Sequence, residues 1–124
     1  SLLYDYGDAI RSGCNRAKED EKNLEQIDFD FDYFKAYTEG FLISLRDIIT
    51  ENEIALLVDG ALTMTYELAL RFLTDYLNHD IYFKIDNEEH NLTRAISQFT
   101  LFKRFKHREL DMRHAVESIW QTLK

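Results

Sequence analysis

Residues 66–84 read Y-E-L-A-L-R-F-L-T-D-Y-L-N-H-D-I-Y-F-K, and this stretch decides the fold. Its apolar positions recur at helical spacing: Leu68, Ala69, Phe72, Leu73, Tyr76 and Leu77. An apolar stripe of this kind predicts a helix with one buried face. The aromatic and charged residues from Ile81 onward favour a short extended segment within a loop over residues 78–87.

A strip of charged residues accompanies the apolar stripe. Glu67, Arg71 and Asp75 are spaced i, i+4 and i+8, so they lie along one side of the same helix. Two interpretations of this strip are open. It is either a solvated face of paired charges or the wall of a pocket, with Arg71 directed at a polar ligand. Periodicity alone does not choose between them.

The same helix extends toward the N-terminus as far as a start signal at Thr50. The sequence T-E-N-E is a capping box, with Thr50 at the N-cap and Glu53 at the third helical position. The apolar pattern then continues to Leu77, for about seven turns, and the pair Asp59-Gly60 predicts a bend within it. Its length and broad apolar face are typical of the central helix of a bundle.

Four further helices are expected, over residues 3–12, 31–45, 88–105 and 110–123, with a polar connector over residues 13–28. In the fourth predicted helix, the residues expected to face inward are Leu92, Ile96, Phe99 and Phe102. The basic residues near its end match the negative pole of a helix. The predicted fold class is therefore all-α, a bundle of about four to five helices.

Composition supports one helical domain, or part of one. The chain of 124 residues is 45% hydrophobic and 14% aromatic, enough for a genuine core. It contains no proline and only four glycines, which is unusual for an all-β or loop-rich protein.

Charge and cysteine content exclude several classes of function. A formal net charge of −8 argues against nucleic acid and anionic membranes as partners. The single cysteine, Cys14, permits no intrachain disulfide and no cysteine-cluster metal site. No apolar run approaches the roughly 20 residues that span a bilayer. We therefore expect a cytoplasmic protein with no membrane partner.

The segment I-D-F-D-F-D, residues 27–32, has two interpretations. Its alternating aspartates resemble a carboxylate metal site, but the glycine and terminal glutamate of an EF-hand loop are missing. Phe29, Phe31 and Phe34 need burial, and Asp30 is a good N-cap for the helix that follows. We interpret the segment as part of the core.

No catalytic motif is present in the chain. It has no glycine-rich phosphate loop, no G-x-S-x-G and no H-E-x-x-H. The four histidines are scattered, and Cys14 has no identifiable base, so we expect no metal site and no catalytic residue in the chain.

Two segments of the sequence resemble segments found in one superfamily. S-L-L-Y-D-Y-G-D-A-I-R-S-G, followed by A-K-E-D-E, resembles the segment after the metal-binding I-D-x-D-T motif of the aminoglycoside phosphotransferase and choline kinase-like superfamily. R-F-L-T-D-Y-L-N-H-D-I-Y-F-K and E-H-N-L-T-R-A-I-S-Q-F are similar to the C-terminal part of one branch, the N-acetylhexosamine 1-kinases. The resemblance covers most of residues 1–105.

The resemblance implies that the chain is the C-terminal helical portion of a kinase-like fold. The catalytic H-x-D-x-x-x-x-N loop, the metal-binding aspartate and the nucleotide-binding lobe would all precede Ser1. Phosphoryl transfer needs these parts together with ATP and Mg²⁺. The fragment would therefore be inactive alone, and its partner would be the missing N-terminal part of its own protein.

The resemblance also implies a substrate site. Arg71 and Tyr82 would contact the hexosamine, since arginine donates several hydrogen bonds and tyrosine stacks on a sugar face. Asp8 and Arg11 would brace the catalytic loop, and Glu67 and Asp75 would support Arg71 from the same helix. Choline, an amino alcohol or another sugar remain open as substrates.

The competing hypothesis is a stand-alone, non-catalytic helical binding or scaffold module. It predicts a well-covered core. The kinase hypothesis instead predicts uncovered side chains where the remaining lobe would pack: Leu2, Leu3, Tyr4 and Tyr6. The opening phrase S-L-L-Y-D-Y-G-D is apolar and aromatic, which favours a piece of a longer protein. Such an exposed apolar surface would also favour a homodimer.

Overall fold

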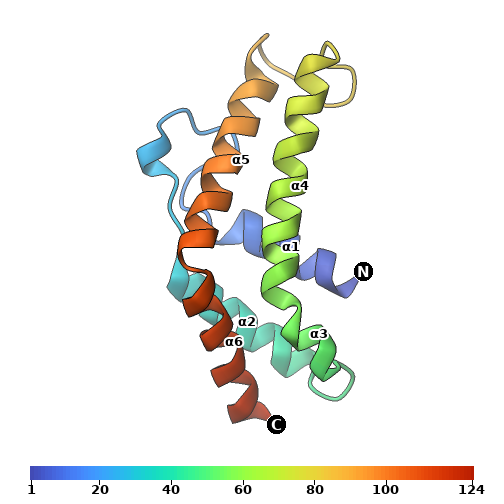
Figure 1. The fold of residues 1–124 in the computed structure, drawn as a ribbon, viewed down its shortest axis with the longest axis vertical. Coiled ribbons are helices and arrows are strands. Elements are labelled where there is room, and N and C mark those ends of the chain that lie inside the picture. Colours follow the sequence, from blue (N-terminus) through green and yellow to red (C-terminus); the bar gives the residue numbers. More distant parts are fainter.

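The computed structural model describes residues 1–124 and contains helices but no strand (Figure 1). The elements are α1 (Leu2–Gly13), the 3₁₀ helix η1 (Leu24–Gln26), α2 (Phe31–Leu45), α3 (Glu51–Ala55), α4 (Leu57–Leu77), α5 (His90–His107) and α6 (Glu109–Leu123). The all-α prediction is confirmed, with helix boundaries within two residues of those expected for four of the predicted helices. No helix combines the length and the apolar composition needed to cross a bilayer.

Six α-helices form, rather than four to five, because the long central helix is divided. Leu56, with φ of −101° and ψ of 0°, lies between α3 and α4, and its N–H donates to the carbonyls of Glu53 and Ile54. The predicted bend at Asp59-Gly60 is wrong. The N–H of Gly60 donates to the Leu56 carbonyl at 2.9 Å, and α4 continues without interruption to Leu77.

Gly60 instead permits a close crossing between α4 and α1. A Cβ added at Gly60 would lie 2.8 Å from the carbonyl oxygen of Leu3, and a Cβ at Gly7 would overlap the carbonyl oxygen of Gly60. Only glycine lets two helix backbones approach this closely. Figure 1 shows α1 passing behind the vertical pair formed by α4 and α5.

Local capping signals set the starts of α2 and α3 as predicted. The Asp30 carboxylate accepts from the N–H of Tyr33 at 3.0 Å, and the Thr50 and Glu53 side chains form both bonds of the capping box. Phe29 is 4% exposed, so the aromatic part of the I-D-F-D-F-D segment belongs to the core. This confirms its interpretation as a core segment.

One core joins the helices and the connector, and Tyr6 lies within it. Tyr6 is fully buried, packs its ring against Phe41, and shares a 2.7 Å hydrogen bond with the Thr38 hydroxyl. The prediction that Tyr6 would be uncovered is therefore wrong. Tyr4, one turn away from the crossing, is 53% exposed as that prediction requires.

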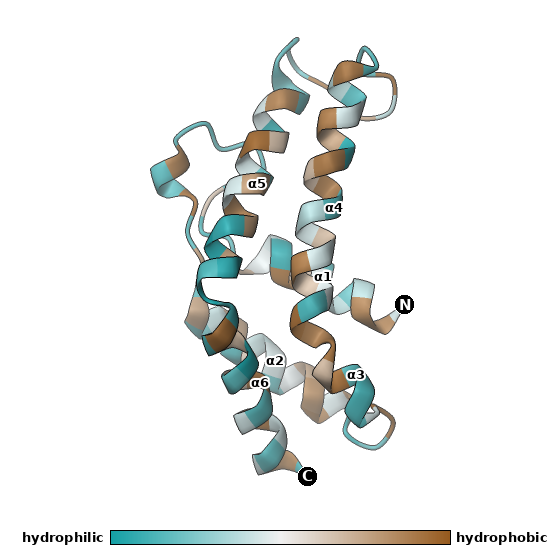
Figure 2. Ribbon diagram, in the orientation of Figure 1, coloured by the Kyte–Doolittle hydropathy of each residue, from teal (hydrophilic) through white to brown (hydrophobic).

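The buried face of α5 differs from the predicted one. Of the four residues predicted to face inward, Leu92, Phe99 and Phe102 are half-buried, and the two phenylalanines pack against Tyr66 of α4. Ile96 is 46% exposed, whereas Asn91, Ser97 and Gln98 are buried. Asn91 and Gln98 have hydrogen-bond partners on other elements, which allows polar side chains to occupy interior positions. Figure 2 shows hydrophilic and hydrophobic residues alternating along this helix, so apolar periodicity is a poor guide to its orientation.

Candidate functional site

Two adjoining pockets lie against one side of α4 and share Glu67, Arg71 and Phe83. The larger, which we call the main cleft, has a volume of about 510 Å³ and is also bounded by α1, the connector and α5. The smaller, which we call the loop pocket, has a volume of about 350 Å³ and lies between the end of α4 and the loop over residues 78–89. Volumes of this size suit small molecules.

The structure brings together the six site residues named from the sequence. The main cleft is lined by Asp8, Arg11, Glu67 and Arg71. The loop pocket is lined by Glu67, Arg71, Asp75 and Tyr82. Residues separated by more than 70 positions therefore meet at one place, and the roles given to them stay predictions.

Arg71 stands at the junction of the two pockets. Its guanidinium lies 5.5 Å from the centroid of the Tyr82 ring and 5.8 Å from that of Phe83. It makes no ion pair with any carboxylate, including its helical neighbours Glu67 and Asp75. The strip lines the two pockets, and Glu67 and Arg71 are exposed without forming an ion pair with each other. That Arg71 is directed at a ligand stays a prediction.

Asp75 is buried, 6% exposed, and holds the loop that carries Tyr82. Its carboxylate accepts from the N–H groups of Tyr82 at 2.7 Å and Phe83 at 2.9 Å, and from the Asn91 side chain at 2.8 Å. Burial alone would raise the pKa of Asp75. The donated hydrogen bonds outweigh burial, and the pKa lies below its ordinary value.

The loop itself makes a tight reversal directly after α4. His79 and Asp80 have φ values of 67° and 60°, in the left-handed region. The N–H of Asp80 donates to the Asp75 carbonyl at 2.8 Å, and its carboxylate accepts from Asn91 at 3.0 Å. This reversal returns Tyr82 and Phe83 to the side of α4 on which Arg71 lies.

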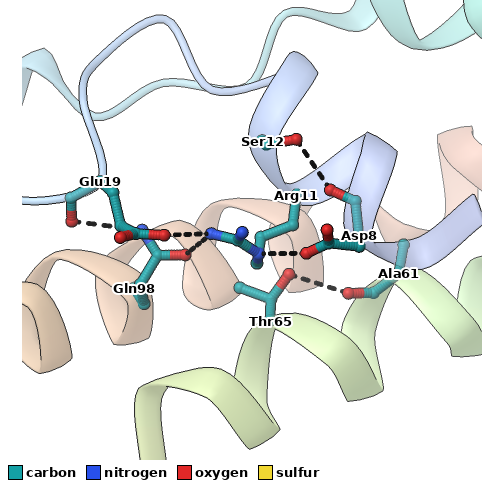
Figure 3. A network of polar contacts seen from close by, with 7 residues as sticks. All are labelled: Asp8, Arg11, Ser12, Glu19, Ala61, Thr65 and Gln98. Atoms are coloured by element: carbon teal, nitrogen blue, oxygen red, sulfur yellow. Dashed lines mark hydrogen bonds and ion pairs between the residues drawn. The ribbon is translucent and has the colours of Figure 1, made fainter. Parts of the chain in front are cut away.

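Arg11 forms the far wall of the main cleft and joins three elements (Figure 3). Its side chain donates to Asp8 of α1 at 3.0 Å, to Glu19 of the connector at 2.9 Å and to Gln98 of α5 at 3.1 Å. The guanidinium fork suits such a junction because it presents several donors in fixed directions. Asp8 and Arg11 thus form the α1 side of the main cleft.

His90 provides a further link between the connector and α5. It is 6% exposed, its Nε2 lies 2.9 Å from an Asp20 carboxylate oxygen, and its Nδ1 accepts from the N–H of Asp86. The hydrogen bond with His90 lowers the pKa of Asp20. This histidine therefore has a structural position beside the cleft.

Sequence reasoning missed several residues that line the main cleft, among them Phe83, Lys84 and Arg94. Phe83 and Lys84 directly follow Tyr82, so their proximity to it was available from the sequence. Arg94 lies on α5 and donates to the Lys84 carbonyl at 2.9 Å. Its position depends on the orientation of α5, which the apolar pattern gave only in part.

The residues described here offer neither a reactive thiol nor a metal site. Cys14 is fully buried, and burial together with the charge of Asp30 raises the pKa of its thiol to about 12. No group of three or more His, Cys, Asp or Glu side chains is arranged to hold a metal ion. What the cleft offers is hydrogen-bonding groups, charge and aromatic faces.

No model of a known protein family matches the chain.

Proposed function

We propose that the chain is the substrate-binding helical part of an ATP-dependent small-molecule kinase, which phosphorylates a hydroxyl of a sugar such as an N-acetylhexosamine. The observation that carries the proposal is Arg71. It lies without a carboxylate partner between two pockets, beside the ring of Tyr82. An arginine left free in a protein with an excess of acidic residues is suited to binding a ligand.

The groups around Arg71 suit a polyhydroxylated ligand. Arg71 can donate several hydrogen bonds to hydroxyl or amide oxygens, and Glu67, which has no partner within the protein, can accept them from hydroxyl groups. Tyr82 is 73% exposed and offers a ring face against which the apolar side of a sugar can pack.

The chain would contribute binding rather than phosphoryl transfer. That reaction needs a nucleotide cradle, Mg²⁺ and a base, and the chain has no glycine-rich phosphate loop and no cluster of metal ligands. The residues present do not fit Mg²⁺-ATP, so both would be held by other parts of the protein. Asp8 and Arg11 would support those parts from one side of the cleft.

Replacing Arg71 with alanine tests this role in the intact protein that contains the chain. We expect kcat/KM for the N-acetylhexosamine to fall by about 10- to 100-fold, since one or two hydrogen bonds to a charged donor are lost. Sugar-dependent ATP consumption is the measurement. The matched control is Arg46→Ala, because Arg46 is exposed and contacts only the Leu123 carbonyl, away from the cleft. An unchanged kcat/KM in Arg71→Ala would reject the assignment.

One observation favours a second class of function, a non-catalytic helical binding module. Tyr6 is fully buried within a core cluster of 18 residues, although the kinase hypothesis placed it at an open surface. The same assay separates the two proposals. Sugar binding without sugar-dependent ATP consumption by the intact protein would favour the binding module.

A further inference from the structure

We propose that Arg71, Lys84 and Arg94 form a binding site for an anionic group, a carboxylate or a phosphate, carried by the ligand of the main cleft. This inference rests on the proposed function, because it concerns the same cleft. It assigns the ligand of the cleft to a narrower chemical class, an acidic or phosphorylated sugar. A neutral N-acetylhexosamine carries no such group, whereas the product of the proposed phosphorylation does, so dependence of anion binding on Lys84 is the deciding observation.

Two of the three cations, Arg71 and Arg94, lie beside one pair of aromatic rings. Phe72 of α4 and Phe83 of the loop are in contact, with ring centroids 4.6 Å apart. The guanidinium of Arg71 lies 5.8 Å from the Phe83 centroid, and that of Arg94 lies 5.4 Å from the Phe72 centroid. The two arginines, from α4 and α5, therefore flank one shared platform.

Lys84 is tied to the same platform through its backbone. It follows Phe83 directly, and its carbonyl accepts from the Arg94 side chain at 2.9 Å. The same nitrogen of Arg94 donates to the Asn91 side chain at 2.9 Å, and Asn91 is bonded to Asp75. Arg94 is thus held in position, while its remaining N–H groups are free to donate.

None of the three cations has a carboxylate partner. The ion pairs of the protein involve other basic residues: Arg11, Arg16, Lys35, His90, Lys106, Arg108 and Arg113. The chain carries 23 acidic and only 15 basic residues, so carboxylates are not scarce. Three unpaired cations around one cleft create a local positive potential within an acidic protein.

The acidic residues of the cleft do not cancel this potential. Asp8 and Glu19 both pair with Arg11, on the α1 side of the cleft. Glu67 is the one remaining carboxylate that lines it. Because Asp8 and Glu19 share the one cation Arg11, four cations and three carboxylates line the cleft, which leaves a net charge of +1, with the three unpaired cations on the side away from Arg11. Glu67 is then available to accept hydrogen bonds from sugar hydroxyl groups.

The test compares neutral and anionic probes on the intact protein by isothermal titration calorimetry. The probes are N-acetylglucosamine, N-acetylglucosamine 1-phosphate, glucuronate and inorganic phosphate. We expect at least one anionic sugar to bind about 10-fold or more tightly than the neutral sugar at low ionic strength, and added salt to reduce that ratio.

Lys84→Gln is the informative variant, because Lys84 is exposed and its side chain forms no hydrogen bond or ion pair within the protein. We expect it to reduce the ratio of anionic to neutral affinity by about 5-fold or more. The control is Lys103→Gln, which removes the same charge from an exposed position of α5 that does not line the cleft. It should leave the ratio unchanged.

Each outcome decides the inference. Preferential binding of the phosphorylated sugar that Lys84→Gln weakens identifies phosphate as the anion, and preferential binding of glucuronate that Lys84→Gln weakens identifies a carboxylate. Equal affinity for neutral and anionic sugars, or a ratio unaffected by Lys84→Gln, overturns the anion site and leaves the proposed sugar site standing. Binding of inorganic phosphate that depends on Lys84, with no sugar bound, overturns the proposed function and supports the anion site. No binding of any probe overturns both.

Discussion

The Gly7→Ala variant is expected to be less stable than the wild-type protein by about 2 kcal/mol, in spite of the better helix propensity of alanine. The added methyl group would overlap the backbone carbonyl of Gly60 and press on the Met64 side chain. A backbone carbonyl within a helix cannot rotate away. The α1–α4 crossing must therefore widen, and the cleft between these helices will widen with it.

Gly40→Ala is the matched control for this experiment. Gly40 also lies within a helix, α2, but a Cβ there would meet no atom within 4 Å. Alanine should therefore stabilise the protein at this position, by about 1 kcal/mol. Urea denaturation of both variants, followed by circular dichroism, measures the two effects. If Gly7→Ala gains stability as Gly40→Ala does, the close crossing of α1 and α4 is wrong.

The helix starts could be predicted because their signals are local. The capping box at Thr50 and the N-cap at Asp30 each involve residues only three positions apart, so the sequence contains the whole interaction. The role of Gly60 could not be predicted in this way. Gly60 matters because of the Leu3 carbonyl, 57 positions distant in the chain, and it was interpreted as a bend.

The site residues that lie on α4 could be predicted from the sequence. The contacts between α4 and the other elements of the site were much harder to predict. The spacing of Glu67, Arg71 and Asp75 placed them on one strip, and the structure confirms that the strip lines pockets. Nothing in that spacing shows that Asp75 is buried beneath the following loop. Its burial depends on Tyr82 and Phe83 folding back to donate their N–H groups.

The buried residues of α5 show why apolar periodicity predicted only part of its inward face. Its interior positions include Asn91 and Gln98, whose burial is compensated by Asp75 and Arg11. A pattern that ranks residues by hydrophobicity treats such side chains as exposed. The orientation of α5, and with it the place of Arg94, follows from these hydrogen bonds between elements.

The Asp75→Asn variant is expected to release the loop that carries Tyr82. The amide has one acceptor oxygen in place of the two carboxylate oxygens that now accept from Tyr82, Phe83 and Asn91. Its NH₂ group would face at least one of these donors. We expect the backbone amides of Tyr82 and Phe83 to exchange with solvent about 10- to 100-fold faster, measured by hydrogen exchange.

Asp47→Asn is the control, because Asp47 is exposed and forms no hydrogen bond or ion pair within the protein. It removes the same charge and should leave the exchange of both amides unchanged. Unchanged exchange of the Tyr82 and Phe83 amides in Asp75→Asn would contradict the assigned role of Asp75.

The stability of the wild-type protein and that of the Asp75→Asn variant will depend on pH differently. The folded-state pKa of Asp75 lies below its ordinary value of 3.8, so its ionised form stabilises the fold. That contribution is fully present above the unfolded-state pKa and is lost as pH falls through the folded-state pKa. The gap in melting temperature between wild type and Asp75→Asn should therefore be widest near neutral pH and should narrow below about pH 4.

The Asp75→Asn variant also tests whether Asp75 positions Tyr82 for ligand binding or contacts the ligand itself. Asp75 lines the loop pocket, but its carboxylate is already occupied by the donors of the loop and Asn91, so any effect on the ligand passes through Tyr82. Asp75→Asn should raise KM for the sugar, and a Tyr82→Ala substitution added to it should cause little further loss. Arg71→Ala added to Asp75→Asn should lower affinity further, because Arg71 is held by α4 rather than by the loop. Full additivity of Asp75→Asn and Tyr82→Ala would show that Asp75 acts on the ligand independently of the loop.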